Sequence, residues 1–147
     1  MLQFAYIFMR IIENTFSLHP VPPGTETVQP GNTLPLVPEH RIHVGVDYRP
    51  WPWLQLTLGA GWVSSQFLRG DEVNRQRPLD PYWFTQGGAA VRWRGLEGFV
   101  QINNLANAKY ETFGTFAPNG LQPGNPVERF LTPAPSVNFL AGLQYVF

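Results

Sequence analysis

Cysteine is absent from the 147-residue sequence. Without it the chain has no disulfide framework, no thiol nucleophile and no cysteine-ligated zinc or iron–sulfur site. The absence gives no information about the redox compartment, because oxidising compartments also contain proteins without disulfides. The length sets an upper limit of one domain, residues 1–147, since domains usually hold roughly 100 to 200 residues.

Charged residues are scarce. Lys and Arg total 10, Asp and Glu total 10, and charged residues make up 14% of the sequence, where about 25% is usual for soluble proteins. The zero net charge argues against a nucleic-acid binder, which needs a basic surface to displace counterions from phosphates. With 44% hydrophobic and 14% aromatic residues, the chain either hides its surface or faces something other than water.

Long apolar runs are missing as well. No run is long enough for a transmembrane helix, which needs roughly 18 or more apolar residues. The apolar opening, residues 1–12, is interrupted by Gln3 and Arg10 and lacks the features of a signal peptide. We interpret it as part of the fold. The sequence is then expected to be either a cytoplasmic protein or a fragment of a longer one.

Alternation of apolar with polar or small residues is the strongest pattern present. In segment 41–49, Ile42, Val44, Val46 and Tyr48 share one side of an extended chain, and the other side is polar or glycine. Prolines cannot donate to a sheet and cluster between such segments. We expect six strands, within residues 3–16, 41–49, 54–62, 83–94, 98–107 and 137–147. For residues 3–16 a short helix would also fit.

The connections between the expected strands alternate in length. Short turns are expected at 49–53 and 94–97, and long loops at 17–39, 68–81 and 108–135. In an antiparallel up-and-down meander this puts all long loops at one end, which is typical of outer-membrane barrels, as is the strand length. The alternative is a soluble antiparallel β-sandwich with an aromatic core.

Aromatic residues are expected to gather at both ends of the strands. One group comprises Tyr48, Trp51, Trp53, Trp93, Tyr145 and Phe147, near the short turns, and the other Trp62, Phe67, Tyr82, Trp83 and Phe84, near the long loops. Two such belts are typical of the two membrane–water interfaces of a barrel. The pattern therefore favours an all-β fold that forms part of a transmembrane β-barrel.

Several motifs then resemble one family. They are HRI at 40–42, VDYRP at 46–50, SQFLRGDE at 65–72 and, most specifically, NNLANAKYETFG at 103–114. In this order they resemble the C-terminal part of TonB-dependent outer-membrane receptors, and the resemblance covers roughly residue 11 to the end. Gly142, Tyr145 and Phe147 match the glycine and aromatic positions of the signal that the barrel-assembly machinery reads in this family.

The resemblance implies a fragment of a receptor in the outer membrane of a Gram-negative cell. Members of this family form a barrel of about 22 strands around a plug, and the chain is similar to the last six strands. The implied function is active uptake of a scarce nutrient, most of all a ferric siderophore, without enzyme activity or cofactor. The implied partners are outer-membrane lipid, lipopolysaccharide, the barrel-assembly machinery and, through the N-terminal part of the receptor, the TonB complex. The alternative in the same membrane is a passive porin-type barrel.

Candidate ligand-binding residues lie in two of the expected loops. Arg69, Arg75 and Arg77 could bind an anionic ferric chelate at the extracellular mouth. Alternatively they belong to a solvated loop with internal ion pairs, or contact lipopolysaccharide phosphates.

Aromatic residues supply the second candidate group. Tyr110, Phe113 and Phe116 could stack on an aromatic siderophore or could pack the barrel rim. A metal site at His40 and His43 is not expected, because residues three apart on a strand face opposite sides.

Overall fold

The computed structural model describes residues 2–8 and 28–146, and these residues form eight strands. In the part described there is no helix of the length and apolarity needed to cross a membrane. The strands are β1 (Leu2–Phe8), β2 (His40–Trp51), β3 (Leu54–Val63), β4 (Tyr82–Trp93), β5 (Leu96–Asn103), β6 (Glu111–Pro118), β7 (Val127–Pro133) and β8 (Asn138–Tyr145).

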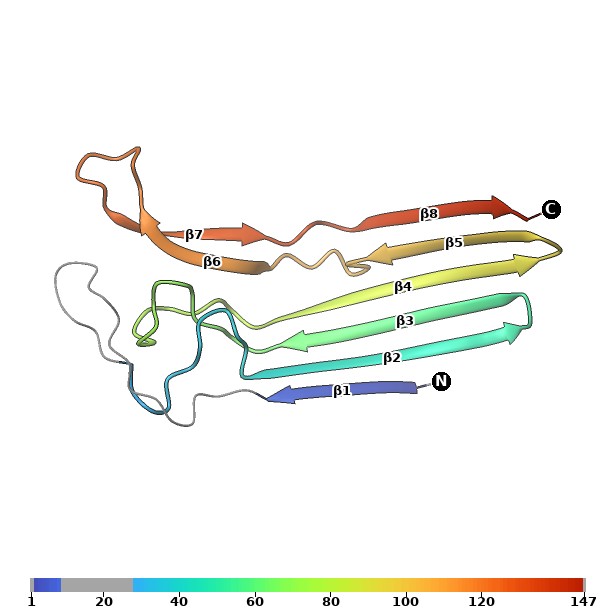
Figure 1. Cartoon of the computed structure of the whole chain (residues 1–147), viewed down its shortest axis with the longest axis horizontal. Coiled ribbons are helices and arrows are strands. Elements are labelled where there is room, and N and C mark those ends of the chain that lie inside the picture. Colours follow the sequence, from blue (N-terminus) through green and yellow to red (C-terminus); the bar gives the residue numbers. More distant parts are fainter. Residues whose placement is uncertain (1, 9–27, 147) are drawn as a thin grey trace.

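Six strands form one antiparallel sheet in the order β1-β2-β3-β4-β5-β8, and β6 pairs with β7 in a separate hairpin (Figure 1). Each strand of the sheet pairs with its neighbour in the chain, except that the hairpin is inserted between β5 and β8. The prediction of an all-β, antiparallel up-and-down meander is therefore confirmed. The opening of the chain forms a strand over Leu2–Phe8; the remainder of the segment predicted at 3–16 lies outside the described residues.

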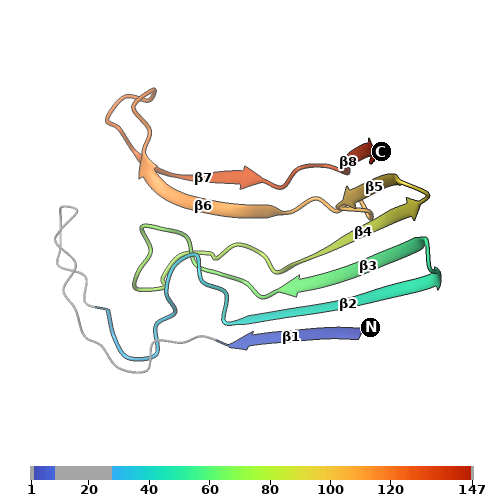
Figure 2. The ribbon, with the colours of Figure 1, turned by 45° about the vertical axis from the view of Figure 1, so that its right-hand side comes forward.

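The short and long connections lie at opposite ends of the sheet. The end that carries the two short turns, here called the turn end, also carries the start of β1 and the end of β8 (Figure 1). One of these turns is Arg94–Gly95, where both residues have positive φ, 46° and 81°, as the tight primed turns of β-hairpins require. The other end, with the three long connections, is called the loop end. In a second view the β6–β7 hairpin again extends beyond the sheet there (Figure 2).

The register places the predicted apolar residues on one face. Neighbouring pairs connect Val46 to Leu58, Leu58 to Gly87, Gly87 to Ile102 and Ile102 to Phe139, so one row of apolar or small residues crosses five strands. Because side chains alternate between faces along a strand, the adjacent row lies on the opposite side. That row contains Asp47, Thr57, Gly88, Gln101 and Leu140. The two sides are called the apolar face and the polar face.

Two predicted strand boundaries are wrong. The strand predicted at 98–107 ends at Asn103, because Asn104 and Asn107 adopt positive φ, 52° and 48°, and close a turn in which the Asn107 amide donates to the Asn104 carbonyl at 2.8 Å. Asparagine tolerates this conformation better than other side chains that carry a Cβ. The strand predicted at 41–49 instead extends through Pro50 to Trp51, with a register irregularity between Tyr48 and Trp51 that accommodates the proline.

The long loop predicted at 108–135 contains two strands. Proline spacing does not predict the hairpin β6–β7, because Pro118 and Pro133 stand at strand ends, where proline is tolerated. Threonine, phenylalanine and valine in the same segments favour extended structure.

The buried apolar side chains lie at the loop end and not between sheet layers. Among the described residues the buried hydrophobic side chains are Val28, Val63, Leu68 and Leu79. On the apolar face of the sheet, by contrast, Leu58 is 59% exposed and Phe139 is 77% exposed. In the described part of the chain, no second sheet covers the six-stranded one. A single layer with an exposed apolar face does not have the packed core of a β-sandwich.

Candidate functional site

The polar face carries hydrogen bonds between side chains of neighbouring strands. Near the turn end, Thr57 Oγ1 donates to Asp47 Oδ1 at 2.8 Å, and Gln144 Nε2 donates to Glu97 Oε2 at 2.9 Å. Arg92 Nε lies 3.6 Å from Glu97 Oε1. The carboxylates of Asp47 and Glu97 therefore have polar partners on neighbouring strands, as is common for cross-strand side-chain pairs.

Farther toward the loop end the polar face becomes aromatic and amide-rich. The Phe84 ring lies over Gly61, where a Cβ would collide with the ring. On its other flank it stacks with His43 at a ring separation of 6.3 Å. The glycine leaves room for a flat ring to lie against the sheet at this position.

The loop between β3 and β4 is anchored to the β6–β7 hairpin. Arg69 forms a parallel bridge with Thr115, and its backbone N–H donates to the Gly114 carbonyl at 3.2 Å while its carbonyl accepts from Phe116 at 2.8 Å. The buried Leu68 side chain packs against Gly114, at 2.7 Å from the position of a Cβ there. A side chain at 114 would push Leu68 out of this contact.

Buried polar residues order the remainder of the same loop. Asp71 is 3% exposed, and its carboxylate accepts hydrogen bonds from the backbone amides of Arg75 at 2.8 Å and Gln76 at 2.9 Å. Asn74 adopts a positive φ of 59° and donates to the Thr33 carbonyl at 3.0 Å. The Asp71 bonds order the loop internally, and the Asn74–Thr33 bond connects it to segment 28–39.

The three candidate arginines have different surroundings. Arg77 forms an exposed ion pair with Asp80, with N–O distances of 3.2 and 3.0 Å. Arg69 and Arg75 are also exposed, and Arg69 has no ion-pair partner among residues 2–8 and 28–146. The predicted internal ion pair is thus present at Arg77, and Arg69 is the arginine of the set best placed to attract an anion.

The three candidate aromatic residues do not form one cluster. Phe113 and Phe116 stand three residues apart on β6 and so face opposite sides of the hairpin. Phe116 adjoins Arg69 through the backbone hydrogen bond described above. Tyr110 lies elsewhere, stacked on Tyr82 with ring centroids 4.4 Å apart and an interplanar angle of 8°.

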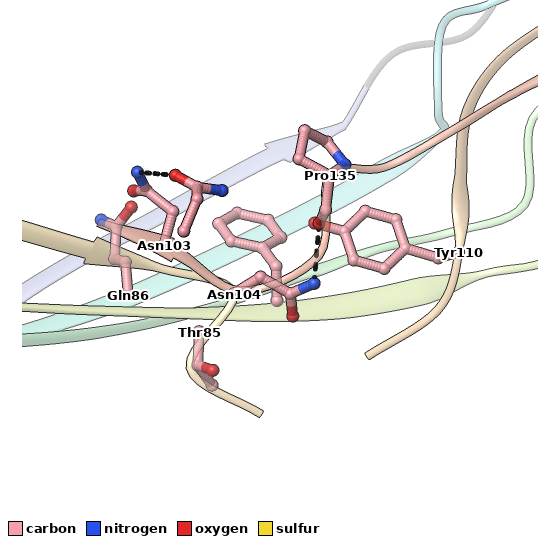
Figure 3. Close-up of a pocket in the computed structure, with 8 residues that line it drawn as sticks. Thr85, Gln86, Asn103, Asn104, Tyr110 and Pro135 are labelled. Atoms are coloured by element: carbon pink, nitrogen blue, oxygen red, sulfur yellow. Dashed lines mark hydrogen bonds between the residues drawn. The ribbon is translucent and has the colours of Figure 1, made fainter. Parts of the chain in front are cut away.

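A hollow of about 280 Å³ lies where the polar face meets the loop end. Figure 3 shows amide side chains from the sheet and the turn beside Tyr110. The hollow is lined by Phe84, Thr85, Gln86, Asn103, Asn104, Tyr110, Pro135 and Asn138. Of these, only Tyr110 was a predicted site residue. The others were missed because they come from four separate segments, although the asparagines at 103 and 104 were already visible as part of the family-like motif.

One asparagine holds the rim of this hollow together. Asn104 is 5% exposed, and its Nδ2 donates to the carbonyls of Ala108 at 2.9 Å and Pro135 at 3.0 Å, while its Oδ1 accepts from the Ala108 amide at 2.9 Å. The bond to Pro135 is visible in Figure 3. Asn104 therefore joins the two ends of the connection that contains the hairpin. This hydrogen bonding gives the asparagine a structural role.

Tyr110 contributes a neutral phenol to the hollow. Burial raises the pKa of the Tyr110 phenol above its ordinary value of 10.0, and the neighbouring Tyr82 raises it further. The group therefore stays protonated at physiological pH and can donate a hydrogen bond.

Exposed aromatic residues lie at both ends of the apolar face, in agreement with part of the predicted belts. Tyr82 and Phe84 do not fit the prediction, because they pair with Val63 and Gly61 on the polar face. At the turn end the Trp51 and Trp53 rings stack at 5.3 Å, and the Arg94 guanidinium lies 5.1 Å from the centroid of the Trp93 ring. Toward the loop end Trp62 pairs with Trp83 across β3 and β4. All five tryptophans are at least partly exposed.

The residues predicted for the assembly signal belong to the last strand. Gly142 and Tyr145 lie in β8, on its polar and apolar faces respectively. Phe147 lies outside the described residues. The functional assignment of this signal remains a sequence-based prediction.

Comparisons with known proteins bear on the fold. No protein-family model and no curated protein matches the sequence. Among solved structures, the chain is similar to the siderophore receptor PiuA from Acinetobacter baumannii, with a TM-score of 0.70 and 15% sequence identity. The match covers 98% of this chain and 19% of that receptor's chain. The chain thus has the fold of about one fifth of a siderophore receptor.

Proposed function

We propose that the chain is the C-terminal wall of a TonB-dependent receptor in the outer membrane of a Gram-negative cell. In this proposal the apolar face contacts lipid, the polar face lines the barrel interior, and the loop end faces the outside of the cell. The likeness in fold to a siderophore receptor supports this proposal over a passive porin.

The observation that carries the proposal is the division of the sheet into two faces. Apolar side chains such as Leu58, Phe139 and Leu143 are exposed on one face, and a continuous apolar surface of this kind is unusual on a soluble protein. The opposite face has hydrogen-bonded polar side chains. Strands that alternate between lipid and a wet interior are the pattern of outer-membrane barrels.

The proposed substrate is a ferric siderophore that enters from the loop end. Arg69 supports this assignment, because it is exposed and its backbone is fixed by the β6–β7 hairpin. A positive charge at a fixed place in the mouth can attract an anionic chelate. Transport would use energy from the TonB complex, which acts on receptor parts outside this chain.

The proposal can be tested by gene deletion and iron-limited growth. The deletion strain should lose growth on at least one ferric siderophore of a panel, and both plasmid complementation and an intact TonB complex should be needed to restore it. Membrane fractionation should recover the protein in the outer membrane as a heat-modifiable band. Uptake that continues without TonB would indicate a porin, and recovery in the soluble fraction would contradict the proposed location.

A further inference from the structure

The hollow beside Tyr110 has a chemical character different from that of the arginine-bearing loop. None of its eight lining residues carries a charge. Five are non-aromatic residues with amide or hydroxyl side chains, two are aromatic and one is proline. The two ion pairs described above, Arg77–Asp80 and Arg92–Glu97, involve none of the lining residues. A charged ligand group would therefore lose water in this hollow without gaining an opposite charge.

The amides of the hollow retain hydrogen-bonding capacity. Asn103 Nδ2 donates to Asn138 Oδ1 at 3.1 Å, and Asn138 Nδ2 donates to the Ser136 carbonyl at 3.0 Å. Gln86 Nε2 lies 3.5 Å from His43 Nε2. Within the described residues, Asn103 Oδ1 and Gln86 Oε1 take no partner. Two acceptors with neighbouring N–H donors match hydroxyl groups, which both donate and accept.

Aromatic surface completes the hollow. Tyr110 is held by its stack on Tyr82, and Phe84 is held over Gly61, so both rings have restricted positions. Rigid rings beside a few convergent polar groups are typical of small-molecule sites. The combination offers an apolar wall to the C–H groups of a ring and amides to its hydroxyls.

From these observations we infer that the hollow binds an uncharged ring with neighbouring hydroxyl groups, of which a hexose is the simplest example. This inference deepens the proposed function and rests on it: the arginines at the mouth attract anionic groups, and the hollow takes the uncharged, hydroxyl-rich part of the transported ligand or a free saccharide. Its volume of about 280 Å³ accommodates one ring of this size and not a complete large chelate.

The test uses the protein in its natural length, extracted from outer membranes in detergent, and saturation-transfer NMR with three probes. Methyl α-D-glucopyranoside carries the neighbouring hydroxyls, cyclohexanol lacks them, and glucuronate adds a carboxylate to the sugar ring. We expect transfer to the glucopyranoside to exceed transfer to each of the other two by at least about threefold. Equal transfer to all three probes, or none to the glucopyranoside, overturns the inference.

A matched pair of variants links the signal to the hollow. Asn103→Leu removes an amide that lines it, whereas Gln144→Leu removes an amide at the other end of the polar face, where it bonds to Glu97. Loss of the Asn103 amide should lower the transfer signal roughly fivefold or more in the first variant, with little change in the second. An unchanged signal in Asn103→Leu overturns the assignment of the site. Both variants must give the heat-modifiable band of a folded barrel.

The two proposals fail in different ways. If the protein is not a heat-modifiable outer-membrane barrel, the proposed function fails. If the barrel is present and TonB-dependent uptake is found, but the glucopyranoside gives no selective transfer, only the inference about the hollow fails. A free saccharide source is distinguished from a sugar-like part of a chelate by competition: the chelate found in the growth assay displaces the glucopyranoside only if it occupies the same hollow.

Discussion

The Phe99 ring on β5 lies over Gly142, its paired residue on β8, and Phe99 Cε1 is 2.5 Å from the position that a Cβ at 142 would occupy. The same arrangement joins Phe84 to Gly61 on the neighbouring strand pair. In both pairs the glycine removes the side chain that would separate the ring from the sheet. This gives a physical reason for the glycine in the proposed assembly signal, in addition to any recognition by the assembly machinery.

Replacing Gly142 should therefore disturb the last strand pair. Gly142→Val introduces a branched side chain into the space of the Phe99 ring, and forced overpacking of this kind costs about 1–3 kcal/mol. We expect a lower yield of heat-modifiable barrel and a lower unfolding temperature. Gly120→Val is the matched control, because nothing lies within 4 Å of a Cβ at 120. Equal yields for the two variants would contradict the packing role of Gly142.

The loop end should open when its apolar anchor is removed. Leu68 is 0% exposed and packs against Gly114, and truncation of a buried leucine costs about 2–5 kcal/mol. Because Arg69 and Arg75 of this loop are trypsin sites, Leu68→Ala should increase trypsin cleavage on intact cells by at least roughly tenfold. The sheet should remain folded, since Leu68 lies outside it.

The control for this experiment is Leu121→Ala. Leu121 is 97% exposed, so its truncation should leave cleavage unchanged. Resistance of Leu68→Ala to trypsin, with normal surface levels, would show that the loop does not depend on this contact.

The arginines should differ in their effect on uptake. Arg77 is neutralised by Asp80, whereas Arg69 has no ion-pair partner among the residues that the structure describes. Arg69→Gln should lower the uptake of an anionic ferric chelate about fivefold, through loss of a charge-assisted contact. Arg77→Gln should change it less than about twofold, as is usual for exposed ion pairs. Radiolabelled iron uptake at matched surface levels measures both; the reverse order would remove Arg69 from the proposed site.

Removal of Phe147 should impair assembly. This residue is the terminal aromatic of the predicted recognition signal, and its loss should reduce the heat-modifiable band and the surface level of the protein. Phe147→Tyr, which keeps the aromatic ring, should restore both. Normal assembly without Phe147 would count against the signal.

The strands of the sheet could be predicted from the sequence because each carries a pattern of period two over many residues. Val46, Leu58 and Ile102 lie on one face in the register as in the pattern, since side-chain alternation is a local property of an extended chain. The tight turn at Arg94–Gly95 was also predictable, because glycine favours positive φ.

The site could be predicted only in part, because its hydrogen bonds join residues far apart in the sequence. Asn104 bonds to Pro135 and Arg69 bonds to Gly114. Neither contact produces a periodic pattern in the sequence. The hairpin β6–β7 could not be predicted for a related reason: Pro118 and Pro133 end strands, whereas other prolines lie in loops, so the position of a proline alone does not distinguish the two.

The proposed function requires that the apolar face of the sheet lies in lipid and the polar face in water. Because this chain contains no cysteine, single cysteines can be introduced at positions 55 to 58 of β3 and spin-labelled. The accessibility of each label to oxygen and to a water-soluble nickel chelate is then measured in reconstituted membranes. Labels at Leu56 and Leu58 should be accessible to oxygen, which partitions into lipid, and labels at Gln55 and Thr57 to the nickel chelate. Equal nickel accessibility at all four positions would contradict the proposed membrane-spanning sheet.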